Sequence, residues 1–319
     1  PDAGPPVVPD GNLAFEGNPS GVAGTINFDD VDPVTVYESE IEAQSQTADI
    51  VLQASNSILI GTNAFDNASG NAGDGADTLA LAAGSSLTLE TRNLGGGEAG
   101  AIDLVTGGSA GAGLNIVTSG AGTITVNSGV GGDQSTDITL PNLVSDSTIT
   151  VNAGGGATSN VNLDGTVSGG DVDIDATGGV NVNAAVTSTA GDVDINALGD
   201  VIITAVNAGT GAALITAGGS INDAQDDLLA DVTGATVTLT AGSDVGGTVA
   251  AGAVTDTAQA IEVAGVTDLT VDAGGSIIAT GDGADTLADL SIAVDPGTNA
   301  DSTYSLTNFA GVTLVLNDN

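Results

Sequence analysis

Apolar and polar residues alternate in short runs along most of the chain. Three such runs are Leu87-Thr88-Leu89, Ile124-Thr125-Val126 and Ile149-Thr150-Val151. Because neighbouring side chains of a β-strand point to opposite faces, this alternation predicts strands with Val, Ile and Leu inside and Thr, Asn and Asp outside. Glycine-containing corners separate the runs, so each strand is expected to be short, about three to five residues.

A repeat relates these strands to one another. The segment Gly170–Ala176 (GDVDIDA) recurs as Gly191–Ala197 (GDVDINA), 21 residues later, and Val180 and Val201 keep the same offset. Isolated strands of this length cannot bury a face, but coils that stack on one another can. The sequence therefore predicts an all-β fold, a parallel β-solenoid with coils of about 21 residues.

A β-sandwich is the structural alternative, because short strands and tight turns also build that architecture. Sandwich cores usually contain aromatic rings, and residues 66–303 contain none. A sandwich also has no need of a regular repeat, whereas small aliphatic residues fit the narrow interior of a solenoid. Both observations favour the solenoid.

The two ends of the chain differ from its middle. Five of the eight prolines lie in residues 1–19, which predicts an extended Pro-rich N-terminal arm before a single solenoid domain over residues 20–319. Aromatic residues occur only up to position 65 and from position 304 onwards, and residues 312–316 alternate as a closing strand. An open solenoid end exposes apolar side chains and unpaired backbone groups. The predicted subunit contacts are therefore Phe15, Phe28, Tyr304, Phe309, Val312, Leu314 and Leu316.

Charge excludes several classes of function. The chain has 41 Asp or Glu residues against one Lys or Arg, and its formal net charge is -40. It therefore lacks the cationic surface that nucleic acids and anionic membranes require. No apolar run reaches the roughly 18 residues of a transmembrane helix, so we expect no membrane insertion.

The residue inventory also argues against catalysis. Histidine and cysteine are absent, which removes the usual general base, the Ser–His nucleophile pair and thiolate metal ligands. We predict that the protein is not an enzyme and that it requires no cofactor.

Calcium is the one candidate ligand that the sequence suggests. The string Gly-Asp-Gly-Ala-Asp-Thr-Leu-Ala occurs at 73–80 and again at 281–288, and it is similar to the calcium-binding nonapeptide of RTX β-rolls. The ligands of a Ca²⁺ ion would be Asp74, Asp77, Asp282 and Asp285. Neither copy is followed by a tandem repeat, which favours the simpler interpretation of an Asp-Gly turn that leads into a strand.

A second group of acids lies in the repeat itself. If the register is that of a solenoid, five aspartates form an outward ladder on adjacent coils about 4.8 Å apart. These are Asp171, Asp173, Asp175, Asp192 and Asp194. Like charges at this distance repel, and a solvated acidic face is favoured over specific ion sites.

The chain resembles filamentous-haemagglutinin-type β-solenoids, which are large bacterial surface and secreted proteins. The resemblance rests on residues 41–45 (IEAQS), residues 50–58 (IVLQASNSI) and the two GDVDI repeats, and it covers most of residues 20–316. It implies a right-handed parallel β-helix at the cell surface or outside the cell, with a role in adhesion, matrix or fibre formation. The start at Pro1-Asp2 would suit a mature product after removal of a signal peptide.

These features predict a structural subunit of an extracellular filament. Its partner would be a second copy of itself, joined head to tail through the N-terminal arm or first coil and the C-terminal strand. The alternative is a monomeric adhesin-type rod that binds a receptor or a host or matrix glycan. A weaker alternative is a calcium-dependent matrix or surface-layer component.

Overall fold

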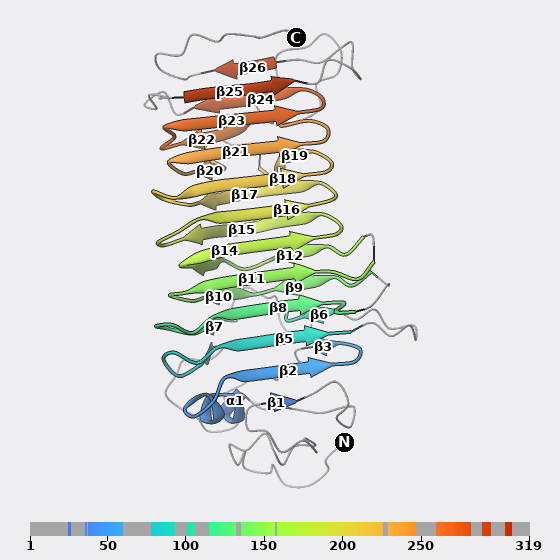
Figure 1. Cartoon of the computed structure of the whole chain (residues 1–319), viewed down its shortest axis with the longest axis vertical. Coiled ribbons are helices and arrows are strands. Elements are labelled where there is room, and N and C mark those ends of the chain that lie inside the picture. The colour runs from blue at the N-terminus through green and yellow to red at the C-terminus, as the bar shows by residue number, and fades with distance from the viewer. Residues whose placement is uncertain are drawn as a thin grey trace.

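The protein is a stack of short parallel strands along one long axis (Figure 1). A computed structural model describes residues 25–26, 36, 38–59, 78–92, 101–105, 115–131, 135–156, 158–225, 229–246, 260–281, 289–294 and 304–307. Among these residues every pair of named strands is parallel, which confirms the predicted all-β parallel solenoid. The predicted arm over residues 1–19 lies outside the described residues, and right-handedness stays a prediction.

One strand of each coil contributes to an eleven-stranded sheet, here called column A, in the described part of the chain. Its strands, in spatial order, are β1 (Thr25–Ile26), β2 (Ile50–Ala54), β5 (Leu87–Thr91), β8 (Ile124–Ser128), β11 (Thr148–Ala153), β14 (Asp171–Ala176), β16 (Val193–Ala197), β18 (Ala212–Ala217), β21 (Thr236–Ala241), β23 (Asp268–Ala273) and β25 (Asp289–Val294). Spatial order equals chain order, as expected when each coil stacks on the preceding one.

The remaining strands form a fifteen-stranded sheet of two columns. Column B contains β3 (Ile58–Leu59), β6 (Ile102–Asp103), β9 (Ile138–Leu140), β12 (Val161–Leu163), β19 (Ile221–Asp223) and the first residues of β15 (Val180–Ser188), β17 (Val201–Asn207), β24 (Ile277–Gly281) and β26 (Tyr304–Thr307). Column C contains β4 (Thr78–Ala80), β7 (Asn115–Val117), β10 (Asn142–Val144), β13 (Val167–Gly169), β20 (Val232–Thr233), β22 (Ile261–Ala264) and the last residues of the long strands. A typical coil therefore has three strands, one in each column.

The length of a coil varies along the stack. Val172 of β14 pairs with Val193 of β16, 21 residues later, and Asp268 of β23 pairs with Asp289 of β25 at the same offset. By contrast, Leu87 of β5 pairs with Ile124 of β8, 37 residues later. Extra residues between strands lengthen some coils without changing the register of the columns.

Rows of aliphatic side chains fill the interior. Val151, Ile174, Ile195 and Ile215 occupy the same position in successive coils of column A, and each has 0% exposure. The residues on either side of them face outward and are partly exposed, as the alternation predicted. The core is therefore a set of stacked rows of Val, Ile, Leu and Ala.

Side chains at the start of many strands connect one coil to the next. The backbone N–H of Asp192 donates to Asp171 Oδ1 (3.0 Å), and the N–H of Ala212 donates to Asp192 Oδ1 (2.7 Å). The N–H of Ser220 donates in the same way to Asp200 Oδ1 (2.8 Å). Asp49, Asp137, Asn142 and Asp244 accept from later coils through the same geometry. Many of the acids therefore satisfy corner amides in addition to meeting solvent.

A single helix occurs among the described residues, at the N-terminal end of the stack (Figure 1). Helix α1 (Glu38–Ser45) has the sequence ESEIEAQS, in which Glu, Ala and Gln have good helix propensity. It buries Ile41 in the core, with 8% exposure. Residues 41–45, which carried part of the family resemblance, are thus helical and not a strand.

Candidate functional site

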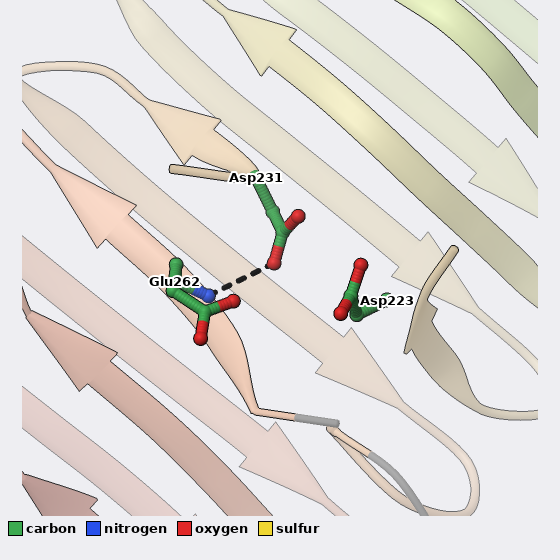
Figure 2. Close-up of side chains that lie close together, drawn as sticks. All are labelled: Asp223, Asp231 and Glu262. Atoms are coloured by element: carbon green, nitrogen blue, oxygen red, sulfur yellow. Dashed lines mark hydrogen bonds between the residues drawn. The ribbon is translucent and has the colours of Figure 1, made fainter. Parts of the chain in front are cut away.

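Three acidic side chains converge at the junction of columns B and C in the C-terminal half (Figure 2). Asp223 ends β19, Asp231 directly precedes β20, and Glu262 lies in β22. Val232 pairs with Val263, so Asp231 and Glu262 occupy equivalent positions in two successive coils. One carboxylate oxygen from each of the three residues lies within 4.8 Å of the other two.

Asp223 occupies a position that is aliphatic in the preceding coils. The register of column B places Ile203 next to Asp223, and before it come Leu140, Leu163 and Val182. These four side chains have 0% exposure. An aspartate thus follows four aliphatic residues in this row, and its carboxylate lies close to those of the other two acids.

Asp231 and Glu262 are buried, with 3% and 7% exposure. The backbone N–H of Glu262 donates to Asp231 Oδ2 at 2.9 Å (Figure 2). The backbone of Asp231 is also paired: its N–H donates to the Glu262 carbonyl (2.9 Å), and its carbonyl accepts from the N–H of Val206 (2.6 Å). Ladder hydrogen bonds on both sides therefore hold Asp231 in place.

The pKa of Asp231 is raised to about 9, and burial is the largest cause. The side chain of Glu262 and the charges of Asp223 and Glu262 contribute to this rise, whereas the hydrogen bond from the Glu262 N–H opposes it. Two carboxyl groups in a low-dielectric site cannot both ionise without a large electrostatic cost. Asp231 therefore holds a proton at neutral pH.

The cluster has two chemical uses. A protonated Asp231 can share its proton with a neighbouring carboxylate, as in other buried carboxyl pairs. Three carboxylates at this separation are also the hard oxygen ligands that Ca²⁺ or Mg²⁺ prefers, so Asp223, Asp231 and Glu262 are the described residues that could hold such an ion.

Several residues predicted from the sequence lie outside the described residues. These are the calcium candidates Asp74, Asp77, Asp282 and Asp285, and the contact candidates Phe15, Phe28, Phe309, Val312, Leu314 and Leu316. Tyr304 begins β26 and pairs with Ile277 of β24, so it belongs to the last described strand of column B. The predicted roles of all these residues, in calcium binding or in subunit contact, stay predictions.

The acidic ladder of the repeat lies on column A in the predicted register. Asp173 of β14 pairs directly with Asp194 of β16. Burial raises the pKa of both carboxyl groups, with the charge of Asp175 adding to each rise, while a hydrogen bond from Asn196 lowers the pKa of Asp194. These acids remain partly exposed, unlike Asp231 and Glu262.

The buried cluster was not predicted from the sequence, although a signal for it exists. Residues 230–234 (ADVTG) and 261–265 (IEVAG) share an acid, then Val, then Gly two residues later, just before a column A strand. Such a match at an offset of 31 residues places the two acids on adjacent coils once the columns are known. When the columns are not known, residues 223–234 resemble a polar loop.

The fold places the chain in the class of parallel β-solenoids. No family model matches the chain, and neither the curated proteins nor the solved structures contain a significant match. The resemblance to filamentous-haemagglutinin-type proteins therefore stays a prediction. Within the described residues, no helix has the length and apolar character needed to cross a membrane.

Proposed function

We propose that the protein is a structural subunit of an extracellular or cell-surface filament, in which copies join head to tail. The observation that carries this proposal is the reduced burial of the aliphatic core rows at the two ends of the described stack. Ile292 of β25 and Leu306 of β26 are only partly buried, whereas their row neighbours Val271 and Ala279 have 0% and 1% exposure.

The N-terminal end shows the same change in burial. Ile58 of β3, the first described strand of column B, is partly buried, whereas its partner in the next coil, Ile102, has 0% exposure. A second copy stacked on either end would bury these side chains and continue the parallel ladders. Edge strands with apolar rows favour such addition.

The sides of the rod favour end-to-end over lateral contact. Asp173, Asp194 and the other outward acids of column A lie along the side of the stack, and the whole chain carries a formal charge of -40. Lateral contact would bring like charges together, whereas a contact at the end buries a row of aliphatic side chains. A heterologous contact that does not close into a ring produces a fibre.

Electron microscopy and light scattering of the purified chain test this proposal. Wild-type protein should form long uniform fibres, and deletion of residues 1–19 or the substitution Leu306→Asp should prevent them without unfolding the coils. Leu198→Asp is the matched control, because Leu198 is 71% exposed at a corner between β16 and β17 and far from either end of the chain. A monodisperse 30.3 kDa particle would contradict the filament and support the adhesin-type rod.

The calcium-dependent alternative has its own test. Chelation of divalent ions should lower the melting temperature if a matrix or surface-layer role depends on Ca²⁺. An unchanged melting temperature in the presence and absence of chelator would contradict this alternative and leave the filament proposal intact.

A further inference from the structure

Column C begins, among the described residues, with the short strand β4, and only one side of β4 meets another strand. In a parallel ladder, successive N–H groups of a strand point alternately to its two neighbours. The N–H of Leu81 donates to Val117 of the next coil at 2.9 Å. The N–H groups of Ala80 and Ala82 therefore point the other way, toward the N-terminal end of the stack.

Helix α1 supplies the acceptors that a preceding strand would otherwise provide. The N–H of Ala80 donates to Glu42 Oε1 at 2.9 Å, and the N–H of Ala82 donates to Ser45 Oγ at 2.8 Å. The Ser45 hydroxyl in turn donates to the Glu42 carbonyl at 2.7 Å, which fixes its lone pairs toward Ala82. Ser45 is buried, with 4% exposure, so this contact is part of the packed end of the stack.

The attachment of α1 to this edge is small. Within the described part of the helix, Ile41 and Ser45 are the buried side chains, and the two side-chain acceptors replace what would be backbone carbonyls in a continuous column. Single hydrogen bonds of this kind add little net stability, because they replace hydrogen bonds with water. A strand of another molecule that offers carbonyls in parallel register can compete with such a cap.

We propose that α1 is an autoinhibitory cap, which keeps the β4 edge from pairing with a second copy of this chain, and that its displacement, together with that of β1 in the same coil, opens this end for assembly. The occupant of the opened edge is the C-terminal end of column C in another copy. Column C ends there, among the described residues, with Leu306 and Thr307 of β26, in the same strand direction that β4 requires. This inference rests on the proposed head-to-tail filament and adds a control point to it.

The variant Glu42→Ala/Ser45→Ala tests the cap, because it removes both acceptors and leaves Ile41 in the core. Its critical concentration for fibre formation should fall about tenfold relative to wild type, the equivalent of about one net hydrogen bond. Gln46→Ala, a change at an exposed residue just after α1, should leave assembly unchanged. Glu42→Gln in place of Glu42→Ala should restore part of the wild-type behaviour, because an amide oxygen can still accept from Ala80.

Hydrogen exchange of the peptide that contains Ala80 and Ala82 gives a second measurement, independent of fibre yield. In the double variant these amides should exchange faster in the monomer and become protected again in fibres. Circular dichroism should show an unchanged β-solenoid. Fibres in which the two amides stay unprotected would overturn the cap, because the opened edge would then have no partner.

The outcomes separate this inference from the proposed function. If wild type forms fibres and the double variant assembles identically, the cap is wrong and the filament stands. If wild type stays monomeric and only the double variant assembles, the cap stands and the filament is not the native state. If neither assembles, both are overturned.

Discussion

Two of the pairs of acids that lie one above the other in this solenoid differ in how far water reaches them. Asp173 pairs with Asp194 on the outward face of column A, where both are partly exposed. Asp231 and Glu262 are equivalent neighbours in column C, but they are 3% and 7% exposed. The spacing between coils is the same, so burial decides the chemistry.

The difference shows what the solenoid tolerates. On column A, water and dissolved ions screen the repulsion between neighbouring carboxylates, so the aspartates can lie next to one another on an exposed face. In the buried cluster there is no such screening, and the protein reduces the repulsion by keeping Asp231 protonated, with a pKa of about 9. One type of side chain is therefore a solubilising group in one place and a proton-binding group in the other.

The largest effect on stability is expected from a core residue next to the exposed Asp173–Asp194 pair. Ile195 lies between Asp194 and Asn196 on β16, faces inward and has 0% exposure. Ile195→Ala should lower the free energy of unfolding by about 2–5 kcal/mol, because it removes buried methyl groups and leaves a cavity. Urea denaturation measures the loss. Asp194→Ala should change stability by no more than about 0.5 kcal/mol, and an equal loss in both variants would contradict the division between core and surface.

A pH-dependent effect is expected from the buried pair. The carboxyl pKa of Asp231 is raised from 3.8 to about 9 in the folded protein, so between these values the folded state binds a proton that the unfolded state releases. Stability should therefore fall as pH rises through this window, by at most about 1.4 kcal/mol per pH unit. Asp231→Asn should remove this slope and be more stable than wild type at pH 8, because an amide keeps the acceptor for the Glu262 N–H.

Thermal unfolding at several pH values between 5 and 8 measures this difference. Asp194→Asn is the matched control, because it removes the same charge from the exposed pair and should leave most of the slope in place. Parallel slopes for wild type and Asp231→Asn would show that Asp231 is ionised in the folded protein.

The smallest effect is expected on the outward ladder. Asp173→Asn should raise stability by a few tenths of a kcal/mol at low ionic strength, because it relieves repulsion from Asp175 and Asp194. The gain should disappear in about 1 M salt, where the screening length is about 3 Å. A gain that persists in high salt would mean that the repulsion on this face is not screened.

The sequence repeat and the alternation of apolar and polar residues were sufficient to predict most of the fold. The match of GDVDIDA with GDVDINA predicted the pairing of Val172 with Val193, and alternation predicted that Ile174 and Ile195 face inward. The number of columns was not predicted, because strands such as β10 and β13 have three residues each and leave no clear periodicity. Helix α1 was missed for a related reason, since eight residues without a strong apolar stripe give little helical signal.

The buried acids could not be placed from local sequence. Asp231 and Glu262 are 31 positions apart, and only the register of β20 with β22 brings them together. Their burial depends on the packing around the two coils, whereas each acid alone resembles the many others on the surface. By contrast, the alternation around Asp173 was sufficient to place it on an outward face.

The coils differ in their number of residues, so the length of the stack depends on the number of coils and not on the number of residues. Each coil advances the stack by about one strand spacing, 4.7–4.9 Å, whether the next strand follows after 21 residues or after 37. Additional residues between strands therefore leave the axial position of the later strands unchanged. Such a molecule can gain or exchange lateral loops while the distance between its two ends stays the same.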